Sequence, residues 1–267
     1  MSNRRVALTI AGSDSSGGAG IQADLKTFAA LGVYGTSAIT AVTAQNTLGV
    51  IETLPLPADL VTAQIEAVAG DITIHATKIG MLATAAIVEA VAAAIKELDL
   101  PLVVVDPVMT STSGAHLLDD DGVKMLRAEV LPRSAVVTPN IPEAEILSGR
   151  RIESIDEARA AAYLIHEMGS SAVVITGGHA KGEQIVDLLF DGERFTELHT
   201  ARIDTPHTHG TGCTFASAIA AYLARGDSLV ESVVRAQEYV GGAIRHALPL
   251  GHGRGPVDHF WKYGVMG

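Results

Sequence analysis

The stretch Leu102-Val103-Val104-Val105-Asp106-Pro107 indicates the class of fold more clearly than any other part of the sequence. Its four leading apolar residues do not alternate with polar ones, which is typical of a central parallel strand buried on both faces. Pro107 cannot extend a hydrogen-bonded ladder, so we expect Asp106 at the carboxyl end of this strand. Ligands of parallel α/β sheets bind at such ends. The stretch therefore predicts an α/β fold with a carboxylate at its functional edge.

Similar apolar runs recur on either side of this stretch and alternate with helical patterns. We expect further strands at residues 6–11, 36–44, 74–79, 135–138 and 172–175. We expect helices at residues 21–31, 57–69, 84–98, 211–224 and 228–246, and one more that begins at the capping pattern Ser154-x-x-Glu157. Residues 184–190 and 194–199 flank Asp191-Gly192, which is typical of a β-hairpin. This order predicts a mostly parallel sheet with antiparallel strands at an edge and helices on both faces.

The composition narrows the class of protein and its partners. The chain has 267 residues, 48% of them hydrophobic, which is enough for one large core. Because 30 acidic residues outnumber 19 basic ones, the formal charge of −11 argues against nucleic acid or an anionic membrane as a partner. The single cysteine suits a reducing compartment, and the sequence shows no secretory or membrane-spanning segment. We therefore expect a cytoplasmic protein whose residues 1–267 form a single domain.

A second informative stretch is Thr208-His209-Gly210-Thr211-Gly212-Cys213-Thr214, which places the only cysteine at the start of an alanine-rich helix. Glycines permit a tight turn, and a helix N-terminus adds unpaired N–H groups and about half a positive charge. Such a place favours phosphate, and it lowers the pKa of a thiol so that the thiolate is favoured. Without this context, Cys213 would be a small buried apolar residue.

An earlier glycine-rich loop, residues 12–20, follows the first expected strand and opens a helix. Residues 18–23 fit the dinucleotide fingerprint, but no acidic residue ends the next strand, as that fingerprint requires. The loop also lacks the Gly-Lys-Ser/Thr end of a P-loop. It is either a flexible loop without a ligand or, as we favour, a loop that brings its backbone and Asp24 to a small substrate.

An amide and two carboxylates stand at further strand ends. Gln45 can donate and accept at once, as recognition of a heteroaromatic ring edge requires, although a Gln45-Asn46 turn is the structural alternative. Asp106 and Glu143 follow neighbouring strands and together suit a hydrated Mg²⁺, whereas helix capping or turn formation would explain either acid alone. The loop and C-terminal histidines do not indicate zinc, because only one cysteine is present; they are His207, His209, His252 and His259.

With these motifs in place, the sequence resembles the hydroxymethylpyrimidine/phosphomethylpyrimidine kinases of thiamine biosynthesis, in the ribokinase-like superfamily. The resemblance runs nearly end to end and rests on residues 11–14 through 24–26, 43–47, 78–81, 106–109, 138–140, 177–179 and 209–214. The first and last of these are specific together, because most ribokinase-like sugar kinases carry Asp where Cys213 stands. The resemblance implies a three-layer ribokinase-like kinase domain over residues 1–267.

The resemblance also implies roles for individual residues. Gln45 and Asp24 would hold the aminopyrimidine edge, and the ring pocket would be lined by Gly12, Ala19, Met81 and Val108. Asp106 and Glu143 would organise Mg²⁺, and Asn140 would lie near the nucleotide phosphates. An anion hole for the transferring phosphoryl group would be formed by the amides of Gly210, Thr211, Gly212 and Cys213. Cys213 would lie nearest the reacting hydroxyl, as general base or orienting acceptor.

Two positions depart from the family pattern. Thr176 and Pro206 stand where the family commonly has lysines that hold ATP phosphates. The resemblance implies a homodimeric, ATP- and Mg²⁺-dependent kinase that phosphorylates 4-amino-5-hydroxymethyl-2-methylpyrimidine and then its monophosphate. Pyridoxal kinase is the nearest alternative, because its substrate is also a hydroxymethylated six-membered nitrogen heterocycle. A pyrimidine-binding protein without turnover is an alternative of another class.

Overall fold

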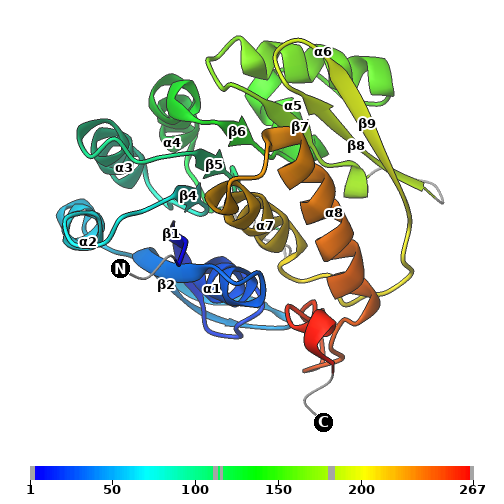
Figure 1. The fold of residues 1–267 in the computed structure, drawn as a ribbon, viewed down its shortest axis with the longest axis horizontal. Helices are drawn as coiled ribbons and strands as arrows, with labels where there is room; N and C mark the ends of the chain where they lie inside the picture. The colour runs from blue at the N-terminus through cyan, green and yellow to red at the C-terminus, as the bar shows by residue number, and fades with distance from the viewer. Residues whose placement is uncertain (1–3, 111–113, 115–116, 180–183, 265–267) are drawn as a thin grey trace.

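The computed structural model describes residues 4–110, 114, 117–179 and 184–264, and these contain a nine-stranded sheet (Figure 1). Its order is β3-β2-β1-β4-β5-β6-β7-β8-β9. The strands are β1 (Val6–Asp14), β2 (Tyr34–Asn46), β3 (Gly49–Pro55), β4 (Ala76–Ile79), β5 (Val103–Val105), β6 (Val136–Val137), β7 (Val173–Ile175), β8 (Gln184–Phe190) and β9 (Phe195–Ala201). The six central strands β2, β1, β4, β5, β6 and β7 pair in parallel, while β3, β8 and β9 pair antiparallel at the two edges. The α/β fold and its mostly parallel sheet are confirmed.

Helices cover both faces of this sheet, as Figure 1 shows. One face packs against α2 (Ala58–Ala69), α3 (Ala85–Glu97), α4 (Asp120–Met125), α5 (Ile141–Ser148) and α6 (Ile155–His166). The other packs against α1 (Gly20–Ala30), α7 (Thr211–Arg225) and α8 (Leu229–Arg245). Short helical turns span Leu126–Val130, Leu131–Arg133, Gly177–His179 and Trp261–Tyr263. None of the helices in the described ranges has the length and hydropathy needed to span a membrane.

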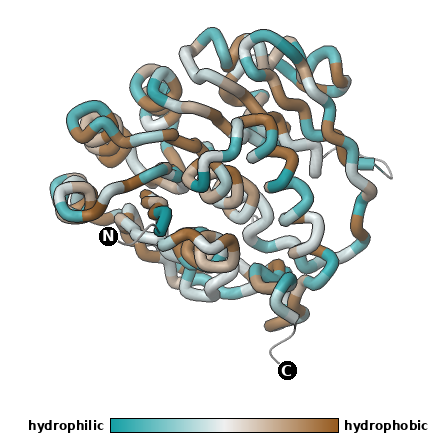
Figure 2. Tube along the Cα trace, viewed as in Figure 1, coloured by the Kyte–Doolittle hydropathy of each residue, from teal (hydrophilic) through white to brown (hydrophobic). Residues whose placement is uncertain are grey.

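Helix α7 is the most deeply buried helix, and its sequence explains why. Every residue from Thr214 to Ala224 is buried, and six of the eleven are alanine or serine. Small side chains let the helix approach both the sheet and the neighbouring α8 closely, and they preserve dense packing. In Figure 2 the central strands next to α7 are mostly apolar, whereas α8 carries hydrophilic segments.

One strand of the sheet was not predicted. Strand β3 pairs with the far end of β2 and gives the sheet a second antiparallel edge, opposite the predicted hairpin of β8 and β9. None of its residues is buried, so its sequence carries no buried run and no clear alternation of apolar and polar positions. Strand β2 itself extends to Asn46, which places Gln45 within its last residues.

Candidate active site

Two glycine-rich loops meet at the carboxyl edge of the sheet. Gly210 has φ +82°, and a Cβ built on it would lie 1.8 Å from the Gly18 carbonyl oxygen. Gly20 has φ +57°, and a Cβ there would lie 2.4 Å from the Gly12 carbonyl oxygen. Only glycine combines this backbone conformation with such close approach. The loop after β1 and the start of α7 are therefore in backbone contact.

The N-terminus of α7 faces this junction with unpaired donors. Gly210 is its N-cap residue, and no side chain caps the helix. As residues of the first turn, Gly212 and Cys213 have amides without an intrahelical partner. Thr211 differs, because its amide and its hydroxyl donate to the Thr208 carbonyl at 3.3 and 2.8 Å. Of the four amides expected in the anion hole, that of Thr211 is thus already used.

Cys213 is a free, half-buried thiol. Burial raises its pKa to about 12, because the opposing attraction of Lys78 is smaller and the carboxylates of Asp106 and Asp24 add to the rise. The Gly20 amide hydrogen-bonds the sulfur, and the thiol interacts with the Asp106 carboxyl. The resting thiol is therefore protonated, contrary to the thiolate expected from the helix N-terminus alone.

Beneath the thiol lies a cluster of charged side chains that centres on a lysine. Lys78, in β4, is fully buried, with Nζ 3.0 Å from Asp24 Oδ1 and 3.7 Å from Asp106 Oδ2. Burial alone would lower the pKa of Lys78, but the negative charges around it, Asp24 first, raise the pKa instead. Sequence reasoning gave this lysine no role. A charged residue inside an expected apolar strand was the signal that pointed to it.

Asp24 belongs to this cluster rather than to the ring pocket. Its carboxylate is fully buried and accepts hydrogen bonds from Thr9 Oγ1 and Ser217 Oγ, both at 2.6 Å, besides the ion pair with Lys78. With these partners it has no path to a ligand. The expectation that Asp24 holds the pyrimidine edge is therefore corrected: the helix α1 turns this residue inward, on the same face as Ile21 and Phe28.

Asp106 and Glu143 form the candidate metal site. Asp106 Oδ2 is buried without a hydrogen-bond partner among the described residues. Burial, and then the charge of Asp106, raises the pKa of Glu143 to about 8. Glu143 also caps α5, with Oε2 2.9 Å from the Asn140 amide. Within the described ranges, no three His, Cys, Asp or Glu side chains cluster to hold a metal alone. A carboxylate oxygen without a hydrogen bond, 3.7 Å from Lys78 Nζ, and a second carboxyl group beside it are oxygen donors of the kind that Mg²⁺ takes.

The two residues expected to bind the nucleotide, Asn140 and Thr176, lie next to each other. Asn140 and Thr176 form an isolated parallel bridge beyond β6 and β7, and the Thr176 amide donates to the Pro139 carbonyl at 2.9 Å. The Asn140 side chain accepts the Glu143 amide at 2.9 Å, so it completes the capping box of α5. The structure thus brings Asn140, Thr176 and Glu143 together, at the strand ends beside Asp106.

The ring-pocket candidates lie on the other side of the junction. The backbone amide and carbonyl of Gln45 both bond the Ser15 hydroxyl, at 2.8 and 2.7 Å. A Cβ on Gly12 would lie 2.4 Å from Met81 Cε, so these two residues are in contact. Ala19 is half-buried and donates its amide to Asp14 at 2.8 Å. Val108 follows β5 in a turn, with its amide 2.8 Å from the Asp106 carbonyl.

Two further polar residues at this side were missed by sequence reasoning. His209 Nε2 lies 2.8 Å from Asp14 Oδ2 and 3.4 Å from the Gln45 carboxamide nitrogen, and both His209 and Asp14 are buried. Burial raises the pKa of Asp14, but hydrogen bonds from His209, Ser16 and the backbone outweigh it and bring the pKa to about 2. The position of Asp14 at the end of the first strand was the available signal.

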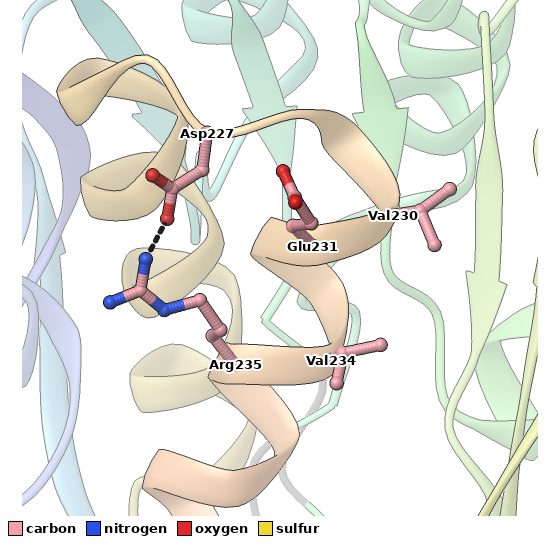
Figure 3. Close-up of a pocket in the computed structure, with 5 residues that line it drawn as sticks. All are labelled: Asp227, Val230, Glu231, Val234 and Arg235. Carbon is pink, nitrogen blue, oxygen red and sulfur yellow. Dashed lines mark hydrogen bonds and ion pairs between the residues drawn. The ribbon is translucent and has the colours of Figure 1, made fainter.

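A surface hollow of about 260 Å³ lies apart from this site (Figure 3). Asp227 and Arg235 pair in it, and its other lining residues are Val230, Glu231 and Val234. It lies at the start of α8, beyond the C-terminal end of the 15-residue α7, so about 20 Å of helix separates it from Cys213. The hollow is not part of the candidate active site.

Known proteins resemble this chain over nearly its whole length. The family model for phosphomethylpyrimidine kinase matches residues 14–258. The hydroxymethylpyrimidine/phosphomethylpyrimidine kinase of Bacillus subtilis is 51% identical, over 95% of this chain and 94% of that protein. The thiamine biosynthesis bifunctional protein of Geobacter sulfurreducens is 50% identical over 94% of this chain, which spans only 51% of that longer protein.

A solved structure shows the same relationship in three dimensions. The crystal structure of an ADP complex of Bacillus subtilis pyridoxal kinase has a TM-score of 0.93 and 42% identity, and the match covers 98% of this chain and 100% of that one. The family match and this structural similarity cover nearly the same residues of the chain. The chain belongs to the phosphomethylpyrimidine kinase family.

Proposed function

We propose that this chain is a kinase that uses ATP and Mg²⁺ to phosphorylate 4-amino-5-hydroxymethyl-2-methylpyrimidine, and then its monophosphate, in thiamine biosynthesis. The observation that carries the proposal is the contact between the two glycine loops, which sets the start of α7 and Cys213 above Asp106. A Cβ on Gly212 would lie 4.0 Å from Asp106 Oδ1. The names of the relatives support the substrate, and the ADP complex of the similar pyridoxal kinase supports the donor.

Substrate binding uses the ring side of the junction. Gln45 offers a donor and an acceptor to the edge formed by a ring nitrogen and the exocyclic amine. The ring itself packs against small and apolar residues, namely Gly12, Ala19, Met81 and Val108. This arrangement directs the hydroxymethyl group toward Cys213.

Phosphoryl transfer uses the start of α7. The amides of Gly210, Gly212 and Cys213, with the helix dipole behind them, stabilise charge on the transferring group. The Cys213 thiol orients the attacking hydroxyl. Because the transition state of phosphoryl transfer is loose, positioning and charge neutralisation matter more than early removal of the proton. A neutral thiol is therefore compatible with this role.

The donor side uses the remaining strand ends. Asp106 and Glu143 would hold Mg²⁺, which when bound neutralises phosphate charge. Asn140 and Thr176 would lie near the nucleotide phosphates. Since Thr176 and Pro206 replace lysines of the family pattern, the N-terminus of α7 would supply positive field to the phosphates, whereas the charge of Lys78 is already matched by Asp24 and Asp106.

One assay tests the proposal against its alternatives. ADP release is measured with the aminopyrimidine alcohol, with pyridoxine and with neither. We expect turnover with the aminopyrimidine. Faster turnover with pyridoxine would instead support a pyridoxal kinase, an alternative that the similarity to a solved pyridoxal kinase favours. Binding of the aminopyrimidine without ADP release would support a binding protein.

We also propose that residues 1–267 act as a single domain, as a homodimer in the cytoplasm. The antiparallel pair formed by the end of β2 and by β3 carries several apolar side chains that are 45–76% exposed, namely Val42, Leu48, Ile51 and Leu54. Such a patch is typical of an interface between subunits. Light scattering on Ile51→Asp tests this idea: we expect a monomer, and an unchanged dimer would place the interface elsewhere.

A further inference from the structure

The orientation of the Gln45 carboxamide follows from its neighbours, and its consequence for ring recognition rests on the proposed function. The first neighbour is His209. Asp14 Oδ2 accepts from His209 Nε2 at 2.8 Å and from the amides of Ala19 and Gly18 at 2.8 and 3.2 Å. Asp14 Oδ1 accepts the hydroxyl and the amide of Ser16, both at 2.8 Å. A carboxylate with so many donors is ionised and can only accept. His209 Nε2 therefore carries its proton.

The second neighbour is Thr43, two residues before Gln45 on β2. Its Oγ1 lies 2.7 Å from the Ser13 carbonyl oxygen. A carbonyl only accepts, so the single hydroxyl hydrogen of Thr43 is used in that bond. Toward Gln45, the Thr43 oxygen can therefore only accept. Thr43 itself is buried, with 5% of its surface exposed.

The Gln45 carboxamide lies between these two groups. As placed in the structure, Gln45 Nε2 lies 3.4 Å from His209 Nε2, and Gln45 Oε1 lies 3.2 Å from Thr43 Oγ1. With Nε2 toward His209, a donor would face a donor, and Oε1 would face a hydroxyl whose hydrogen is already used. A half-turn of the carboxamide removes both conflicts at once, and amide orientation is assigned from such networks. We infer that the Asp14–His209 pair and Thr43 hold Gln45 with Oε1 toward His209 and Nε2 toward Thr43, and so act as positioning residues for ring recognition.

This orientation sets the order of donor and acceptor along the edge that faces the ligand. One N–H of Nε2 and one lone pair of Oε1 remain free. They match a ring nitrogen beside an exocyclic amine in one sense only. A reversed carboxamide would require the ring to turn over, which would move the neighbouring hydroxymethyl group to its opposite side, away from Cys213. The His209 and Thr43 contacts thus link ring recognition to the position of the reacting oxygen.

The first test needs no substrate. ¹⁵N NMR of the ligand-free protein at neutral pH reports which ring nitrogen of His209 is protonated, with the signals assigned from a His209→Asn variant. We expect the Nε2–H tautomer. The Nδ1–H tautomer would overturn the inference, whatever reaction the enzyme catalyses.

The second test compares two variants at one position. Thr43→Val removes the acceptor for Gln45, whereas Thr43→Ser keeps the hydroxyl. We expect Thr43→Val to raise KM for the aminopyrimidine about fivefold, with kcat and KM for ATP changed less than about twofold, and Thr43→Ser to restore KM. Equal effects of both variants, or an unchanged KM, would contradict the inference. If the wild type does not phosphorylate the aminopyrimidine, the proposed function fails, while the tautomer of His209 still decides the inference.

Discussion

The two halves of the candidate site differ in how well their polar groups are satisfied. On the ring side, Asp14 accepts bonds from His209, Ser16 and the backbone, and its pKa falls to about 2. On the phosphoryl side, burial dominates, and the pKa values of Glu143 and Cys213 rise to about 8 and about 12. There Asp106 Oδ2 is also buried without a hydrogen bond among the described residues, with Lys78 Nζ 3.7 Å away. Both halves are made from strand ends of the same sheet, so their architecture does not explain the difference.

The difference indicates which half is complete before ligands bind. Satisfied hydrogen bonds make the ring side a preorganised recognition surface, which binds without rearrangement. On the phosphoryl side Glu143 holds its proton, and among the described residues the single cation of Lys78 faces the two carboxylates of Asp24 and Asp106. In the proposed function, the positive charge of a bound Mg²⁺ would offset these carboxylates. In the proposed function, the ring side is therefore complete once the protein has folded, whereas the phosphoryl side is completed by its ligands.

Removing Lys78 should have the largest effect, because among the described residues it is the cation that pairs with the buried carboxylates of the phosphoryl side. Lys78→Met leaves Asp24 and Asp106 buried without a cation, and the loss of one partner of a buried ion pair costs about 3–5 kcal/mol. Urea unfolding measures this free energy. Lys124→Met is the control, since Lys124 pairs with Asp121 on the exposed surface and should matter by less than about 1 kcal/mol. Equal losses would mean that the cluster is not held by its lysine.

Cys213→Ala should act on transfer and spare recognition. Loss of the group that orients the hydroxyl should lower kcat by about 10²-fold or more, with little change in KM for the pyrimidine. Cys213→Asp, which introduces the acid of the sugar kinases, should recover part of the rate. Steady-state kinetics measures both values. Near-full kcat in Cys213→Ala would leave the amides of α7 as sufficient and remove the cysteine from the mechanism.

The two halves should respond to pH in opposite directions. The folded pKa of Asp14 lies below its ordinary value of 3.8, so its contribution, about 2 kcal/mol, is present above pH 3.8 and is lost as the pH falls toward 2. The folded pKa of Glu143 lies above its ordinary 4.5, so stability is lost as the pH rises from 4.5 toward 8. Unfolding is followed across this range in the presence of a chelator. Asp14→Asn should remove only the loss of stability below pH 3.8, and Glu143→Gln should remove only the loss between pH 4.5 and 8. If either variant removes both losses of stability, the ionisation of one half of the site affects the other half.

Gln45→Leu should have the smallest effect and should be confined to recognition. An unpaired ring nitrogen and amine cost about 1–3 kcal/mol, so KM for the aminopyrimidine should rise about tenfold or more. The Tm should change little, because the backbone of Gln45 keeps its bonds to Ser15. Kinetics and thermal unfolding check the two statements separately. An unchanged KM would place the ring elsewhere.

The sequence predicted the fold where burial controls residue choice. Val103–Val105 and the β8–β9 hairpin follow from apolar runs and from turn chemistry, which are local signals. Strand β3 was missed because an exposed edge strand carries neither signal. For the same reason, the predicted ends of two strands were too early: β1 and β2 extend beyond their apolar runs to Asp14 and Asn46.

Within the site, the sequence predicted which loops carry the chemistry better than it predicted which groups are used. The fate of Asp24 depended on Lys78 and Ser217, which lie on β4 and α7 and are distant in sequence. The amide of Thr211 is taken by Thr208 in a turn that propensity does not specify. The protonation of Cys213 depends on its desolvation and on the nearby carboxylates of Asp106 and Asp24, which outweigh the helix dipole. Each of these properties depends on residues that are distant in sequence or on local geometry, so a short sequence motif does not specify it.

The contact between the two glycine loops also bears on how this enzyme is made. Asp14 and His209 are 195 positions apart, and Asp24 and Ser217 are 193 apart. Contacts of such separation form late and slow the folding of a chain. During synthesis, the first loop therefore waits until α7 has left the ribosome before its histidine and serine partners arrive. Activity then reports that the whole sheet has assembled, and a nascent chain that stops before α7 lacks the helix N-terminus and Cys213 that the phosphoryl side needs.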